Sequence, residues 1–471
     1  MFRSLRHADY RIWFVGALVS NVGAWMQSTA QNWVVLTELS ANDALAVGLT
    51  MALQFGPQLL LVPVTGLIAD RFDRRKILLV TQGAMMALGL ALGLLLLGHA
   101  ELWHLYVFAG LLGIVNAVDT PARQTFVADL VAGADMSNAV ALNSASFNAA
   151  RMIGPALAGL AIVVVGSGWV FIVNAVTFLA VIGALLLLLR RPMRRMARAP
   201  RERGAFVAGF RYVLGRPDLV VVFVMVFLIG AFGMNFPIFS STMAVEFGRG
   251  AGEYGVLNSI LAIGSLTGAL LAARRDRARM RVIILATAAF GVAALISSVM
   301  PVYWWFAAST ILIGFTAVTI LTTANGYVQT TTDPLLRGRV MAIYMAILSG
   351  GTPVGAPIVG AVANSWGPRW ALGIAAIAAG VAALIGLGWL VVARGMRLRR
   401  HPERRWAPAI SFTDAPTAAI AVVPTMPVAV QGASAPVVDT LMAQEAEAAD
   451  AEEREARRVP VPARGEAAAV R

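Results

Sequence analysis

The sequence predicts an all-α integral membrane protein with twelve transmembrane helices in two six-helix bundles that are related as parallel repeats. Of the 471 residues, 58% are hydrophobic and 13% are charged, and the mean hydropathy is +0.74, whereas about a quarter of the residues in soluble domains are charged. The apolar runs have the length of a spanning helix and lack period-two alternation, which excludes a membrane barrel. A long basic gap divides these runs into six and six.

The apolar runs define the expected helices in chain order. The expected spans are residues 12–36, 45–69, 77–98, 103–120, 142–165, 169–189, 219–243, 253–273, 282–300, 303–326, 340–363 and 370–393. The expected domains are a first bundle over 1–189, a linker over 190–218, a second bundle over 219–395 and a tail over 396–471. The linker is basic and interrupted by proline, which is typical of a surface connection. The tail is rich in Ala, Pro, Glu and Arg, which predicts disorder.

The two halves of the chain resemble each other when the sequence is shifted by 201 residues. The shift aligns Gly154 with Gly355, Gly159 with Gly360, Gly166 with Gly367 and Trp169 with Trp370. Chance is the alternative in a chain so rich in Ala, Gly and Val. The division into six and six spans favours a true parallel repeat, which is one way in which transporters build two halves.

The distribution of basic residues predicts the orientation. With a cytoplasmic N-terminus, the positive-inside rule places all but three of the 38 Lys and Arg residues in cytoplasmic segments or tails. The exceptions are Arg151, Arg249 and Arg369. We therefore expect a multi-pass protein of the cell (inner) membrane with both termini in the cytoplasm.

Several classes of function are disfavoured by composition. The formal net charge is +13, but the basic residues lie between apolar runs, which argues against nucleic-acid binding. The only lysine is Lys76, so no phosphate-binding loop of the G-x-x-x-x-G-K-[ST] type occurs. The four histidines lie outside the spans or at their edges, and no span holds a pair of carboxylates. We expect no enzyme, no metal site, no cofactor and no cysteine chemistry, and a monomer in the lipid bilayer.

Charge interrupts the apolar pattern at "GLIADRFDRRK", Gly66 to Lys76, between the second and third spans. A membrane-surface anchor would need only the last three basic residues. The additional glycine and acids favour a latch between helices that open and close. The residues expected to form this latch are Gly66, Asp70, Arg71, Arg74 and Arg75. Their pattern resembles the loop signature of the major facilitator superfamily, although Asp73 stands where that family commonly has glycine.

A second pair of motifs, "DTPARQTFVADLV" and "RMIGPALAG", narrows this resemblance. They are similar to the branch of the superfamily that contains macrolide-efflux and enterobactin-exporter proteins among the drug:proton antiporters. The resemblance implies the major facilitator fold and a proton gradient as the energy source. A glycine-proline motif is expected to bend or thin two helices. Its residues are Gly154, Pro155, Gly159, Gly355 and Pro357.

These observations favour a secondary active transporter that exports a bulky amphipathic small molecule, such as a drug, macrolide or siderophore, by proton-coupled alternating access. The expected partners are this small-molecule substrate, protons and the bilayer. The alternatives are an uptake permease for a small solute and a transport-inactive receptor or scaffold of the same fold. Polar side chains inside the spans are candidates for a substrate cavity. They are Arg151, Asn21, Gln27, Gln31, Gln54, Gln58, Asn235 and Tyr344.

Asp119 is the best candidate for proton coupling because no carboxylate is more deeply placed in a span. It lies about 16 residues into the fourth span, roughly 24 Å from the outer face, and Arg123 follows one helical turn later. The alternative is a structural ion pair. Arg151 also has two interpretations: it pairs with Asp119 or nearby carbonyls, or it contacts anionic groups of the cargo, with Thr352 as its counterpart in the second half.

Overall fold

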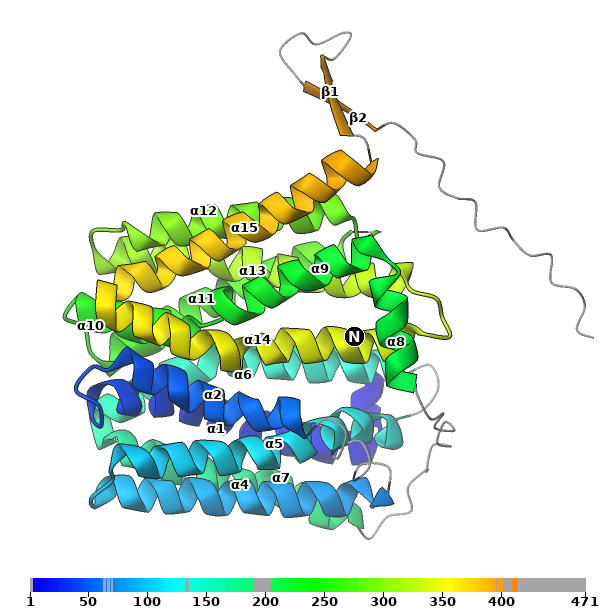
Figure 1. The fold of residues 1–471 in the computed structure, drawn as a ribbon. Coiled ribbons are helices and arrows are strands. Elements are labelled where there is room, and N and C mark those ends of the chain that lie inside the picture. The colour runs from blue at the N-terminus through cyan, green and yellow to red at the C-terminus, as the bar shows by residue number, and fades with distance from the viewer. Residues whose placement is uncertain are drawn as a thin grey trace, which may run out of the picture. The chain divides into compact units, whose positions relative to one another are not determined.

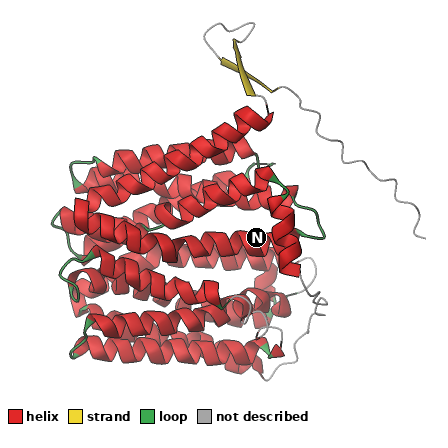
Figure 2. Ribbon diagram, in the orientation of Figure 1, coloured by secondary structure: helices red, strands yellow, loops and turns green. Residues whose placement is uncertain are grey.

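A computed structural model describes residues 3–61, 65, 68, 71–131, 135–189, 205–275, 277–394, 396–400 and 408–412. Helices make up nearly all of this part (Figure 2). The first half contains η1 (Arg3–Arg6), α1 (Ala8–Thr37), α2 (Ala44–Leu60), α4 (Arg74–Leu97), α5 (Leu102–Leu130), α6 (Met136–Val165) and α7 (Ser167–Leu189). The second half contains α8 (Ala205–Leu214), α9 (Pro217–Leu228), η3 (Ile229–Gly233), α10 (Phe236–Glu246), α11 (Ala251–Ala273), α12 (Met280–Ser298), α13 (Tyr303–Thr331), α14 (Arg337–Trp366) and α15 (Pro368–Arg394).

The expected fold class is confirmed. In the part of the chain that the structure describes, ten helical segments are long and apolar enough to cross a membrane. The remaining two expected spans coincide with α1, which is 30 residues long, and the shorter apolar helix α2. Beyond the spans, α8 forms inside the expected linker, and Figure 1 shows it lying across the ends of the spanning helices beside α14. The strands β1 (Met396–Arg400) and β2 (Pro408–Phe412) pair inside the expected tail.

The fourth and seventh expected spans differ most from the observed helices. The fourth was expected to end at residue 120, but α5 continues to Leu130. The seventh was expected to be one helix, but it consists of α9, the π-helical turn η3 and α10. Pro237 at the start of α10 has no N–H to donate to the preceding turn. Just before it, the Asn235 side chain donates to the Ala231 carbonyl four residues earlier. The helix is therefore interrupted at Asn235.

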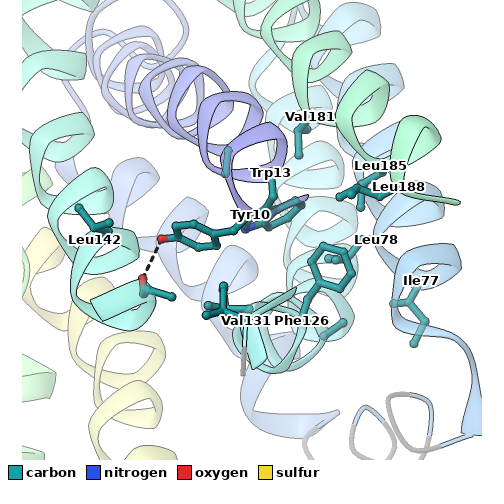
Figure 3. Packing of buried hydrophobic residues seen from close by; sticks show 14 of the residues in the cluster. Tyr10, Trp13, Ile77, Leu78, Phe126, Val131, Leu142, Val181, Leu185 and Leu188 are labelled. Atoms are coloured by element: carbon teal, nitrogen blue, oxygen red, sulfur yellow. Dashed lines mark hydrogen bonds between the residues drawn. The ribbon is translucent and has the colours of Figure 1, made fainter. Parts of the chain in front are cut away.

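The first bundle packs α1, α4, α5, α6 and α7 around an aromatic core near the start of α1 (Figure 3). Tyr10 and Trp13 are almost completely buried, and the Trp13 ring meets Phe126 edge to face at 4.9 Å between centroids. The Tyr10 hydroxyl donates to the Ala139 carbonyl at 2.8 Å, as the dashed line in Figure 3 marks. This core fixes α1 against α5 and α6 at the end of the bundle where α4 begins.

In the second bundle, helix backbones approach each other closely at glycines. A Cβ atom built on Gly264 of α11 would lie 2.1 Å from the Ile311 carbonyl oxygen of α13, and one built on Gly314 of α13 would lie 2.2 Å from the Leu261 oxygen. Only glycine permits helices to approach this closely, which is a common device of membrane proteins. These contacts explain the extensive packing of α11 against α13.

The two bundles join through two equivalent helix pairs, α2 with α14 and α6 with α11. Cβ atoms built on Gly48 and Gly360 would lie 2.4 Å from the Ala356 oxygen and 2.5 Å from the Ala44 oxygen. In the other pair, Cβ atoms built on Gly255 and Gly159 would lie 2.4 Å from the Pro155 oxygen and 2.6 Å from the Ala251 oxygen. The repeated geometry confirms the two-fold relation of the halves. All four contacts lie toward the end of the helical bundles at which α2 begins, directly after Asp43, and we call it the Asp43 end. The opposite end, at which α4 begins with Arg74, is called the Arg74 end.

Candidate functional site

A cavity of about 220 Å³ lies where the two bundles meet, and we call it the central chamber. Its lining comes from both halves of the chain. The lining residues are Trp25, Ser28, Thr29, Asn32, Met51, Gln54, Phe55, Arg151, Pro155, Met234, Phe236, Pro237, Tyr254, Asn258, Leu261 and Thr352. Arg151 and Thr352 each occupy the middle of a 30-residue helix, α6 and α14. The chamber is therefore near the level at which transporters commonly bind cargo.

Arg151 is the charged group of the central chamber. Its guanidinium carbon lies 5.6 Å from the centroid of the Trp25 ring, in a cation–π contact. No acidic side chain among the residues that line the chamber neutralises it, and no described residue accepts a hydrogen bond from it. The alternative that paired Arg151 with Asp119 is therefore wrong. Thr352, the predicted counterpart, lines the same chamber.

A second cavity of about 630 Å³ lies within the first bundle toward the Arg74 end, and we call it the amide chamber. It is lined by α1, α5 and α6, with single contributions from α4 and α7. Its polar lining residues are Ser20, Asn21, Asn116, Asp119, Thr120, Arg123, Gln124, Asn143, Ser144 and Asn148. Thr120, Gln124 and Ser144 are exposed. The chamber therefore opens to the surface and presents mainly neutral hydrogen-bonding groups.

Asp119 forms the buried polar centre at the wall of the amide chamber. It is 3% exposed and accepts hydrogen bonds from the Thr81 hydroxyl at 2.6 Å and the Gln82 amide at 2.8 Å. Its other oxygen accepts from Arg123 Nε at 2.8 Å. The predicted pairing of Asp119 with Arg123 is thus present. Because α5 continues to Leu130, Asp119 lies eleven residues before the helix ends, deeper than the sequence suggested.

Five of the predicted cavity residues line neither chamber. Gln27 accepts from the Asn174 amide of α7, and Gln31 donates to Gln54 at 2.9 Å. Tyr344 is buried and donates to the Leu321 carbonyl at 3.3 Å. Gln58 and Asn235 are likewise absent from both linings, and Asn235 is fully buried at the interruption before α10. Gln27, Gln31, Asn235 and Tyr344 make hydrogen bonds between or within helices.

The expected latch can be followed in part. Gly66 and Asp70 lie outside the described residues, and Arg71 is exposed. Arg74 donates from Nη1 to both oxygens of Asp129 in α5, at 2.7 and 2.8 Å.

Asp73 and Arg75 complete this arrangement at the start of α4. Asp73 caps the helix by accepting from the Arg75 backbone N–H at 2.9 Å, and Arg75 also donates to the Leu188 carbonyl of α7 at 3.1 Å. An aspartate in the position of the family's glycine therefore stabilises a helix start. These contacts tie α4 to α7, as Arg74 ties it to α5.

The glycine-proline motif acts through close packing. Helices α6 and α14 continue without interruption through Pro155 and Pro357. A Cβ built on Gly154 would lie 2.6 Å from Trp25 Cβ, and one on Gly355 would lie 1.7 Å from the Ala231 oxygen. The motif therefore thins the helices at their crossings, which was one of the two expected effects.

The sequence analysis did not select most of the residues that line the amide chamber. Asn116, Gln124, Asn143 and Asn148 belong to this group, as does Phe147. A signal was present, because polar positions recur at spacings of three and four in both α5 and α6, which places them on one helix face.

Twelve helices in two equivalent bundles, with polar chambers inside and between them, define a membrane transporter. The sequence profile of the transmembrane secretion effector family matches residues 1–418. The chain belongs to this family, which is part of the major facilitator superfamily, and it is therefore a transporter and not an enzyme.

The relatives include transporters of iron-chelating compounds. The chain is 24% identical over 367 residues to the staphyloferrin A transporter of Staphylococcus aureus, covering 76% of this chain and 90% of that protein. It is 24% identical over 408 residues to the enterobactin exporter of Salmonella typhimurium, covering 84% and 95%. A solved bacterial homologue of the human lysosomal transporter Spinster, inward-facing and occupied, superimposes with a TM-score of 0.65 at 14% identity over 87% of this chain and 99% of that chain. The last likeness shows the fold alone.

Proposed function

We propose that this protein exports an anionic, siderophore-like small molecule across the cell membrane by proton-coupled alternating access. The observation that carries the proposal is the unneutralised Arg151 in the central chamber. The names of the relatives support the direction and the substrate class.

Arg151 gives the central chamber a preference for anions. An arginine at the middle of a spanning helix costs roughly 2.5–3.5 kcal/mol on insertion scales, so such residues face a partner or water. Here the described partner is the face of Trp25, which leaves the planar guanidinium fork free for a carboxylate. The volume of about 220 Å³ is below the usual range for a whole drug-sized ligand, so it suits one acidic arm of a larger molecule.

The experiment compares Arg151→Lys and Arg151→Ala in inverted membrane vesicles, with staphyloferrin A as the anionic substrate and a neutral dye as the reference. We expect lysine to retain partial transport, because it keeps the charge but loses the planar fork. Alanine should weaken transport of the anion more than that of the dye. Arg249→Ala is the matched control, because this arginine lies near Glu253, 4.0 Å away, and outside both chambers.

Membrane abundance and thermal stability are measured for each variant. An equal loss for both substrates, together with poor insertion or low stability of Arg151→Ala, would show that Arg151 is a structural residue. Normal transport of staphyloferrin A by Arg151→Ala would also contradict the proposal.

For the energy source we propose the pair Asp119 and Arg123. Protonation of Asp119 would remove the negative charge that neutralises Arg123 and would thereby leave an uncompensated cation beside the amide chamber. Asp119→Asn should abolish concentrative export and spare downhill exchange. Glu101→Gln is the matched control, because Glu101 is exposed at the start of α5 and lines neither chamber. An unchanged pH dependence in Asp119→Asn would assign coupling to another group.

We also propose that the protein is a monomer of the inner membrane with cytoplasmic termini. The Asp43 end then faces outward, and the contacts there correspond to a state that is open toward the cytoplasm. The chain contains no cysteine, so single introduced cysteines can be labelled from either side with an impermeant maleimide. Labelling of His99→Cys, in the loop between α4 and α5, from the cytoplasmic side would overturn the topology.

A further inference from the structure

Three asparagines of the amide chamber have side chains without hydrogen bonds to any described residue: Asn21 of α1, Asn116 of α5 and Asn143 of α6. A neighbouring amide, Asn148, donates to the Ser144 carbonyl at 2.8 Å. All three are half-buried in the wall of the chamber. Three amides that converge from three helices and have no described protein partner therefore form a surface that can bind a polar partner.

The chemistry of this surface differs from that of the central chamber. Each amide offers two N–H donors and a carbonyl acceptor, and the ionic groups in the wall, Asp119 and Arg123, neutralise each other. In addition, Arg123 Nη1 is buried without a hydrogen-bond partner. The amide chamber therefore suits neutral oxygen-rich groups such as hydroxyl, amide and hydroxamate, whereas the central chamber suits a carboxylate.

An aromatic pair stands between the two chambers. Phe147 lines the amide chamber, Trp25 lines the central chamber, and their rings meet edge to face with centroids 5.7 Å apart. Trp25 also makes the cation–π contact with Arg151. The aromatic pair is therefore a wall that the two chambers share.

We infer that the amide chamber is a separate docking site, which binds the neutral oxygen-rich part of the cargo before its acidic part reaches Arg151, and that Phe147 and Trp25 partition the two sites. This inference rests on the proposed function. The amide chamber, with a volume of about 630 Å³, is within the range of small-molecule sites, which is about 300–1,000 Å³. The central chamber is smaller than that range.

The test uses protection of single cysteines from maleimide in the purified protein in lipid nanodiscs. Asn143→Cys reports on the amide chamber and leaves the other amides in place; Thr352→Cys reports on the central chamber. His99→Cys, in an exposed loop, is the control that neither probe should protect. The probes are desferriferrichrome, a neutral trihydroxamate, and citrate, a tricarboxylate. We expect desferriferrichrome to slow labelling of Asn143→Cys several-fold and citrate to slow labelling of Thr352→Cys several-fold, each without the reverse effect.

The outcomes separate this inference from the proposed function. If citrate protects Thr352→Cys and desferriferrichrome leaves Asn143→Cys unprotected, the docking site is overturned and the anion site stands. If desferriferrichrome protects Asn143→Cys and citrate protects neither position, the docking site stands and the anion preference falls. Protection of neither position by either probe overturns both, and equal protection of both positions by one probe overturns the separation.

The partition has its own measurement. Phe147→Ala should raise the rate at which maleimide labels Thr352→Cys several-fold, because a smaller side chain opens the passage from the amide chamber. Val140→Ala is the control. Val140 also lines the amide chamber, but the ring that meets Trp25 belongs to Phe147, seven residues later in α6, so this variant should leave the labelling rate unchanged. An unchanged rate in Phe147→Ala would overturn the partition.

Discussion

Gly360→Ala should open the Asp43 end by separating α14 from α2. The added Cβ would lie 2.5 Å from the Ala44 carbonyl oxygen, whereas ordinary contacts begin at 3.4 Å. The obstructing atoms are backbone, so a helix must move by nearly an ångström. Overpacking of this kind destabilises a packed arrangement by about 1–3 kcal/mol, which corresponds to about a 5- to 150-fold shift between two conformations. The state with a closed Asp43 end should lose that much population.

The assay is a distance measurement between spin labels at Ala41→Cys and Ser365→Cys, two exposed positions near the facing ends of α2 and α14. Gly360→Ala should add a population with a longer distance. Gly110→Ala is the first control, because its Cβ would meet nothing within 4 Å. Gly264→Ala is the second, because it overpacks α11 against α13 inside one bundle.

The controls separate opening from general damage. Gly264→Ala should lower thermal stability without the longer distance, and Gly110→Ala should change neither. The reasoning is refuted if Gly360→Ala keeps the parent distance distribution, or if Gly264→Ala produces the same longer distance.

Three further predictions concern the charged loop and the tail. Asp70→Asn should reach the membrane at near-normal abundance and export very slowly in vesicles, because a conformational latch is lost; normal export would contradict the latch. Asp129→Asn removes the negative charge and one of the two oxygens that accept from Arg74, and it should lower the unfolding free energy by about 1–3 kcal/mol in thermal or denaturant unfolding; an unchanged stability would show that the pair contributes little. Deletion from Pro408 onward should leave export intact, because the last helix in the described part of the chain ends at Arg394, before the deletion; loss of export at normal membrane abundance would indicate a regulatory tail.

The helices were predictable because the bilayer fixes their length and apolar character. The sixth expected span, 169–189, agrees with α7 within two residues at either end. Apolar runs did not predict the end of a helix that continues beyond its apolar part. Residues 121–130 of α5 are more polar, because some of them line the amide chamber and because Asp129 among them is the partner of Arg74. A low mean hydropathy therefore predicts the end of a span there, although the helix continues.

The binding surface was only partly predictable, because a polar side chain in a span can face either a cavity or another helix. Asn21 and Gln27 both lie on α1, yet Asn21 faces the amide chamber and Gln27 pairs with Asn174, 147 residues later in the chain. Only the position of α7 decides between these roles. Arg151 was predictable as an interior charge, because its cost in lipid leaves few alternatives.

The asymmetry of the duplicated halves has a consequence for adaptation. The ionic and amide groups of the two chambers lie mainly in the first bundle, whereas the second-half counterparts of Arg151, Asp119 and Arg123 are Thr352, Ile320 and Ala324. New substrate specificities can therefore arise by substitutions in the first bundle alone. The second bundle would keep its side of the central chamber and its glycine contacts with the first bundle. Laboratory selection for altered cargo should accordingly enrich substitutions in α1, α5 and α6.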